Sequence, residues 1–204
     1  MIIIWILAFV VAITIHEASH AWMADRLGDP TARLMGRLSL NPIVHYDPIG
    51  TTLLLVLVIM RYMGLPVIPF GWAKPVEFDP YNLKNPRRDS ALISFAGPAS
   101  NLILALIISL IAYFSPSFSI FAVPFIILNV ALAIFNLIPI HPLDGGKILV
   151  GLLPRRYAYE VDSFLHRFGM IILLFLILPT FGGSSFIGNI ISPVLNLFLA
   201  LLIP

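Results

Sequence analysis

An apolar stretch at the start of the chain carries three ionisable residues within five positions. Residues 1–15 are apolar with one exception, and the pentad His-Glu-Ala-Ser-His follows at 16–20. On a helix, His16 and His20 lie one turn apart on the same face, where two imidazoles can hold one zinc ion. Glu17 is beside them, placed to take a proton from an attacking water. Ionisable groups are costly in lipid unless they face a protein interior or a wet cavity, so the setting predicts a hydrolytic metal centre inside a membrane protein.

Composition supports the membrane assignment. The chain is 59% hydrophobic and 11% charged, with a mean hydropathy of +0.99, whereas soluble domains carry roughly 25% charged residues. We expect one intramembrane domain over 1–204, with a catalytic core at about 1–155 and a C-terminal helical hairpin at about 160–204. We expect neither a separate soluble module nor a cleavable signal peptide. The net charge of +2 does not indicate nucleic acid, and the absence of cysteine excludes disulfides and Cys-based zinc sites.

The predicted fold class is an all-α polytopic membrane protein with about five to six transmembrane helices. A span needs about 20 apolar residues, and five segments qualify or nearly do: 2–24, 90–113, 119–139, 167–181 and 184–203. A sixth stretch, 49–63, is shorter. Prolines forbid a continuous helix over 64–78, and the alternation at 72–78 predicts a short β-hairpin or edge strand at the cytoplasmic face.

Basic residues fall in three regions and predict the topology. They follow the first apolar segment, flank 49–63, and follow the third segment, whereas the links 115–119 and 182–185 carry none. By the positive-inside rule all three regions are cytoplasmic. That requires an even number of crossings in 25–89, so we expect 49–63 to dip into the membrane and return. The protein is thus predicted to be integral to the cell membrane, with its site near the cytoplasmic face.

Asp144 is the best candidate for a third zinc ligand. It lies in Asn136-Leu-Ile-Pro-Ile-His-Pro-Leu-Asp144-Gly-Gly, where Pro139 and Pro142 break the third span near its end. The two glycines permit a tight turn that can bring the carboxylate to the metal. The short 115–119 link makes the second and third spans antiparallel, so Asp144 reaches the membrane face of His16 and His20. The alternative is that Asp144 is only a turn residue.

The ordered set of motifs resembles the site-2 protease family of intramembrane zinc metalloproteases. The set is the His-Glu-x-x-His helix, Gly97-Pro-x-x-Asn101, and Asn136-x-x-Pro followed by Leu-Asp144-Gly-Gly. The segments 38–50 and 71–76 are similar to its compact bacterial and archaeal subgroup, and the matches run from about residue 14 to 150. The resemblance implies Zn²⁺ held by His16, His20 and Asp144, and Glu17 as the catalytic carboxylate. It also implies a helical transmembrane substrate and a site that opens to the cytosol.

Five further residues are candidates for substrate binding or for supporting the ligands. His45 either approaches the metal, pairs with Asp47 or is a satisfied interface histidine. His141 supports a ligand or faces solvent. Asn101 and Asn136 either join helices or lie near the substrate backbone, and Trp72 either anchors the chain at the interface or belongs to a strand that pairs with substrate.

The predicted function is intramembrane zinc endopeptidase activity on transmembrane protein substrates in the lipid bilayer. Two rival functions stay open. One is a metal-binding membrane transporter with His and Asp along an ion path, although no internal repeat supports it. The other is a catalytically inactive scaffold, which the intact Glu17 disfavours.

Overall fold

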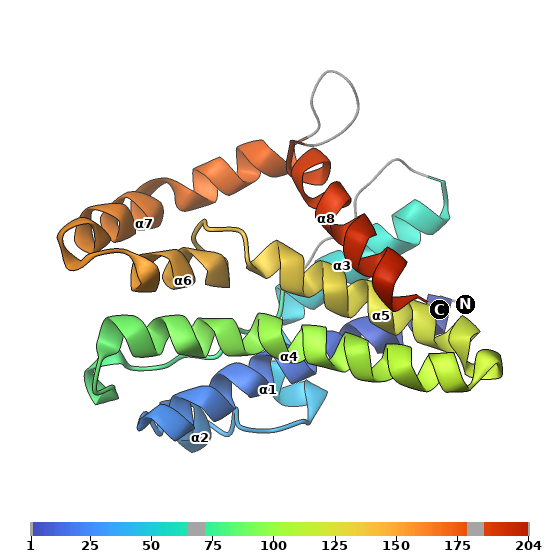
Figure 1. Cartoon of the computed structure of the whole chain (residues 1–204), viewed down its shortest axis with the longest axis horizontal. Coiled ribbons are helices and arrows are strands. Elements are labelled where there is room, and N and C mark those ends of the chain that lie inside the picture. Colours follow the sequence, from blue (N-terminus) through green and yellow to red (C-terminus); the bar gives the residue numbers. More distant parts are fainter. Residues whose placement is uncertain (1, 65–71, 179–185, 204) are drawn as a thin grey trace.

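The computed structural model describes residues 2–64, 72–178 and 186–203, and these are mostly helical (Figure 1). Within these ranges the helices are α1 (Ile2–Leu27), α2 (Thr31–Leu34), α3 (Pro48–Tyr62), α4 (Pro86–Phe114), α5 (Pro116–Asn136), α6 (Asp144–Leu152), α7 (Arg155–Ile177) and α8 (Phe186–Leu202). Two short 3-10 helices, η1 (Pro42–His45) and η2 (Pro80–Asn82), lie between them.

Among the described residues, three helices are long and apolar enough to cross a membrane. They are α1, α4 and residues Ser117–Asn136 of α5. The all-α membrane class is therefore confirmed, but the count of five to six spans is not. The predicted fourth and fifth spans correspond to α7, whose first turns are charged, and α8, which is apolar but short.

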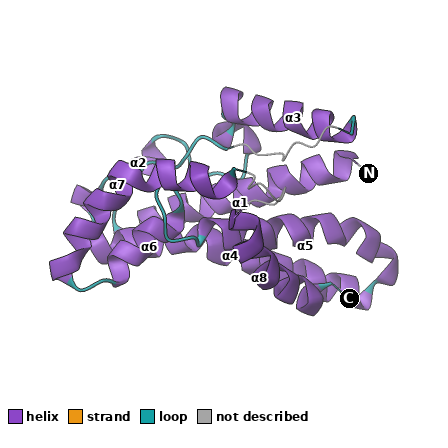
Figure 2. Cartoon of the chain, turned by 90° about the horizontal axis from the view of Figure 1, so that it is seen from above, coloured by secondary structure: helices purple, strands orange, loops and turns teal. Residues whose placement is uncertain are grey.

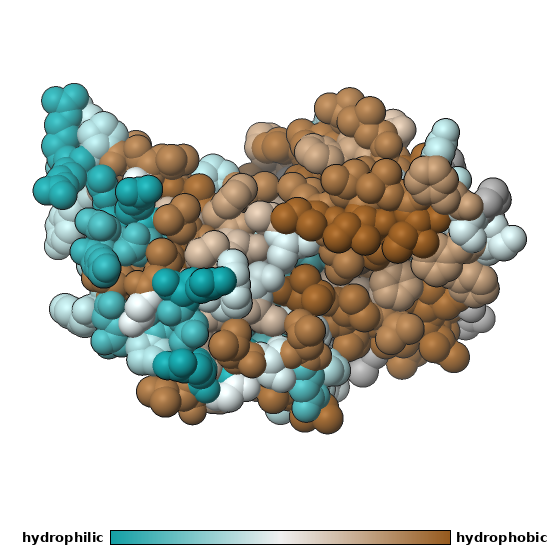
Figure 3. Space-filling view, turned by 60° about the horizontal axis from the view of Figure 1, so that its bottom comes forward, coloured by the Kyte–Doolittle hydropathy of each residue, from teal (hydrophilic) through white to brown (hydrophobic). Residues whose placement is uncertain are grey.

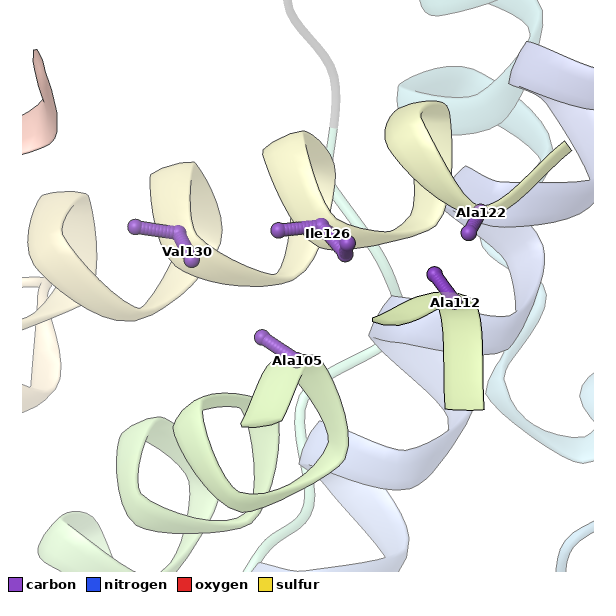
Figure 4. Close-up of a cluster of buried hydrophobic side chains, with 5 residues drawn as sticks. All are labelled: Ala105, Ala112, Ala122, Ile126 and Val130. Atoms are coloured by element: carbon purple, nitrogen blue, oxygen red, sulfur yellow. The ribbon is translucent and has the colours of Figure 1, made fainter. Parts of the chain in front are cut away.

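The centre of the bundle is the antiparallel pair α4 and α5. Small side chains of α4 face branched and small side chains of α5: Ala105, Ala112, Ala122, Ile126 and Val130 (Figure 4). Small residues let two helix backbones approach closely, which is how helices associate where lipid offers no hydrophobic driving force. α1 packs against both α4 and α5, and α8 packs against α5.

The segments before and after α3 lie next to each other. Lys74 N–H donates to His45 O at 3.0 Å, and Trp72 lies against Gly50 in the first turn of α3. Figure 2 shows α3 at the edge of the bundle, on the side away from α8. No strand is assigned to 72–79 or to any other described residue, and the rest of the predicted hairpin, 65–71, lies outside the described residues. The β-hairpin is therefore not confirmed.

The helix breaks in the proline-rich segment after α5, as predicted. α5 ends at Asn136 and α6 begins at Asp144. The link folds back onto α6 so closely that a Cβ on Gly145 would lie 2.2 Å from Ile138 O. Any residue but glycine would force this turn apart, so Gly145 sets where Asp144 lies.

Hydrophilic and hydrophobic surfaces separate along the long axis. Figure 3 shows hydrophilic side chains gathered at the end that carries α2 and the start of α4, and hydrophobic side chains over the other end. The N-terminus of α1 and the α4–α5 turn lie at the hydrophobic end (Figure 1).

Candidate metal centre

His16 and His20 project from one face of α1, and both are buried. Their rings lie edge to face with centroids 4.6 Å apart. Asp144, the first residue of α6, completes the group: its Oδ2 lies 3.1 Å from Nε2 of His16 and 3.3 Å from Nε2 of His20. Two ligand atoms at zinc–ligand distances of about 2.0–2.1 Å and a tetrahedral angle lie about 3.3 Å apart, so the three donors fit one zinc ion.

Hydrogen bonds on the far side of each ring fix which nitrogen faces this group. The amide nitrogen of Asn101 donates to Ala12 O and to Asn129 Oδ1, so Asn101 Oδ1 is the acceptor for His16 Nδ1–H at 2.6 Å. His20 Nδ1–H donates to the carbonyl of Ile93 at 2.7 Å. Both Nε2 atoms are therefore left with a free lone pair, which is the form that binds metal.

The charge state of Asp144 suits the same role. Burial alone would raise its pKa, but without a metal the attraction of protonated His20 and hydrogen bonds from His16 and His20 outweigh burial and hold the pKa well below its ordinary range, and a zinc ion would take the place of those protons. The carboxyl is therefore ionised, as a ligand must be.

α4 passes close to the two imidazoles, and Gly97 leaves room for them. A Cβ on Gly97 would lie 2.4 Å from His20 Nε2 and 2.8 Å from His16 Cε1. No side chain fits there without moving a ring, so Gly97 is part of the site although it offers no donor atom.

Glu17 points into the same cavity and is held by the 72–78 segment. Its Oε2 accepts from the backbone N–H of Val76 at 3.0 Å. The cavity has a volume of about 140 Å³. Its walls come from α1, α4, the end of α5, the link after it, α6 and the 75–78 segment: His16, Glu17, His20, Pro75, Val76, Phe78, Ile93, Ser94, Asn136, Pro142, Asp144 and Lys147. A volume of this size admits a few water molecules and an extended peptide segment, but not a helix about 10 Å across.

Of the five remaining candidates, two lie at the site and three do not. Asn101 and Asn136 lie at the site, Asn101 on the His16 ring and Asn136 in the cavity wall. His45 and Trp72 do not line the cavity: His45 Nε2 donates to Ser39 O at 2.9 Å, and Trp72 packs on Gly50. Asp47 caps α3 instead of pairing with His45. His141 is buried and contacts Asp162 of α7, not Asp144 and not solvent.

Sequence reasoning missed three contributors. Lys147 is three residues after Asp144, so it shares a face of α6 with it, and this spacing was a usable signal. Burial lowers the pKa of Lys147, although Asp144 and Glu17 oppose the change. Asn129, a polar residue in an apolar span, was also detectable. The Val76 contact with Glu17 had no signal, because it depends on the path of the 72–78 segment.

Comparison with known proteins identifies a family and several relatives. The model of peptidase family M50 matches residues 4–125 and 117–176. The chain is 36% identical over 203 residues to "Putative zinc metalloprotease YwhC" of Bacillus subtilis, covering 94% of this chain and 85% of that protein. It is 27% identical to stage IV sporulation protein FB of B. subtilis, over 72% of this chain and 50% of that protein. It is 24% identical to zinc metalloprotease MJ0392 of Methanocaldococcus jannaschii, over 77% of this chain and 37% of that protein. No solved structure matches the chain.

Proposed function

This chain belongs to peptidase family M50, and we propose on that premise that it is an intramembrane zinc endopeptidase acting in or near transmembrane helices of substrate proteins. The observation that carries the proposal is the convergence in one cavity of two imidazole Nε2 atoms, the Asp144 carboxylate and Glu17. This is the ligand set and the proton acceptor that a zinc hydrolase needs.

His16, His20 and Asp144 hold zinc in this proposal, and Asn101 and Ile93 O keep the two rings turned towards it. When bound there, zinc supplies a Lewis acid that activates water and polarises the scissile carbonyl. Glu17 takes the proton of the attacking water and later delivers it to the leaving amine. Lys147 adds positive charge to the cavity wall, where it favours the negative charge that develops on the carbonyl oxygen.

The cavity is too small for a helix, so a substrate helix unwinds before it is cut. Unwinding breaks hydrogen bonds within the substrate backbone, which is costly in a membrane. Residues 75–78 form one wall of the cavity in an extended path, so pairing of the substrate with this segment compensates some of the lost bonds.

We propose five crossings, with α7 and α8 as the fourth and fifth, the N-terminus outside and the site near the cytoplasmic face. Two observations support this topology. The positive-inside rule assigns all three groups of basic residues to the cytoplasm. The contacts of Lys74 with His45 and of Trp72 with Gly50 bring the chain back to where it entered α3.

The test uses the full chain and a transmembrane reporter reconstituted together in vesicles. We expect cleavage of the reporter to stop when a chelator removes the metal and to return when zinc is added. A transporter would move zinc across the vesicle membrane without cutting the reporter, and a scaffold would bind the reporter intact. Either of those results would overturn the proposal.

A further inference from the structure

A second cluster of metal-binding side chains lies outside the catalytic cavity. Asp162 and His166 are four residues apart on α7 and share one face of that helix, and His141 reaches them from the link between α5 and α6. Asp162 Oδ1 is 3.3 Å from His141 Nε2 and 3.3 Å from His166 Nδ1. His166 Nδ1 also lies 3.0 Å from the backbone carbonyl oxygen of Asp162, so a metal binds this nitrogen only in place of its proton. The donor atoms of the three residues all lie within 4.8 Å of one another.

The cluster repeats the ligand set and the spacing of the first centre. Each consists of two imidazole nitrogens around one carboxylate oxygen, and the separations of 3.3 Å equal the edge of a zinc tetrahedron, about 3.3 Å. The two rings lie 4.2 Å apart, centroid to centroid, so one ion can reach both of them.

His141 is the buried member of the cluster, and burial lowers its pKa. Asp162 and His166 are 42% and 65% exposed at their side chains, which leaves the remaining coordination positions open to water.

We propose that His141, Asp162 and His166 bind a second divalent metal ion of the zinc class, which fastens α7 to the link that carries Asp144. The link and α7 are already in tight contact: a Cβ on Gly169, within one turn of His166, would lie 2.4 Å from His141 O. Asp144 follows His141 by three residues, so a metal at this cluster limits the movement of the catalytic ligand. Two imidazoles and one carboxylate with open positions suit zinc, which also accepts water as a ligand.

The test measures the number of zinc ions bound per molecule of the purified full chain. The protein is first equilibrated with a small excess of zinc and then separated from unbound ions. The variants are His166→Ala, Asp144→Ala and the double substitution, with Glu160→Gln on the exposed part of α7 as the matched control. We expect two zinc ions per chain in wild type and in the control, one in each single variant, and none in the double variant. His166 is exposed, so its removal leaves the fold intact, and melting of the metal-free proteins checks this.

A second readout follows the fastening itself. In the Asp144→Ala background, zinc should slow amide hydrogen exchange in 138–143 and in the middle of α7, and His166→Ala should abolish the effect. The proposal is overturned if His166→Ala binds as much zinc as wild type. If wild type binds one zinc ion and only Asp144→Ala removes it, metal binds at the catalytic centre alone and the proposal is overturned. If only His166→Ala removes it, metal binds at this cluster alone and the proposal holds.

Discussion

Asn101 Oδ1 accepts a hydrogen bond of 2.6 Å from His16 Nδ1, which joins α4 to the metal-binding face of α1. The amide group of Asn101 is itself oriented by Ala12 O and Asn129 Oδ1. A chain of hydrogen bonds that crosses three helices therefore decides which nitrogen of His16 faces Asp144.

Asn101→Ala should weaken zinc binding at this centre, because partners of this kind typically change metal affinity about 10–100-fold. Competition with a chromophoric chelator measures the affinity. Asn129→Ala is the control: it removes a partner of Asn101 but leaves the acceptor for His16, so its effect should be smaller. Equal affinities in wild type and Asn101→Ala would show that His16 needs no such orientation.

Gly97→Ala should abolish binding at the same centre, since the added methyl would lie 2.4 Å from His20 Nε2. We expect one zinc ion per chain fewer than in wild type, measured by elemental analysis, together with loss of reporter cleavage. Ser100→Ala, three residues further along α4, should keep both. A fully loaded and active Gly97→Ala protein would mean that the rings do not occupy the positions described.

Protonation of Asp29 should make the protein less stable in acid. This buried carboxylate accepts hydrogen bonds from Thr31 N–H, Thr31 Oγ1, Asp79 N–H and Asn82 Nδ2, joining the end of α1 to η2. Burial alone would raise its pKa, but these four bonds outweigh burial and lower it. Because the pKa of Asp29 is lower in the folded protein than in the unfolded chain, its ionised form stabilises the fold. This stabilisation is complete above the pKa of the unfolded chain, about 3.9, and is lost as the pH falls through the pKa of the folded protein.

Asp29→Asn should therefore cost about 2 kcal/mol of stability at pH 7, the scale of hydrogen bonds to a charged group. Thermal unfolding in detergent from pH 7 to pH 3 measures the difference between variant and wild type, which cancels acid effects at the metal centre. The difference should shrink below pH 4. A constant difference across this range would contradict the assignment.

Single cysteines test the topology directly, because the chain has none of its own. Cysteines at Ser39 and Asn85 should react only with reagent applied from the cytoplasmic side, and one at Ser117 only from outside. Ser39 and Asn85 flank α3, so labelling of these two positions from opposite sides would make α3 a full crossing. Asp144 would then lie on the wrong face of the membrane to meet His16 and His20.

Much of the metal centre could be predicted from the sequence, because its information is local. The four-residue spacing fixes the shared face of His16 and His20, and two prolines with two glycines fix the turn before Asp144. The contacts of Val76 with Glu17 and of His141 with Asp162 could not be predicted. They join segments 59 and 21 residues apart in sequence, and depend on how irregular links pass over the helices.

Glu17→Gln tests the central claim most directly, because glutamine keeps the shape and the hydrogen bond from Val76 but accepts no proton. The measurement is cleavage of a transmembrane reporter by the reconstituted chain, with zinc content determined on the same sample. We predict a wild-type zinc content and a cleavage rate lower by at least 10²–10⁴-fold, about the contribution of general acid–base catalysis. A variant that still cuts the reporter at a rate close to wild type would contradict the account.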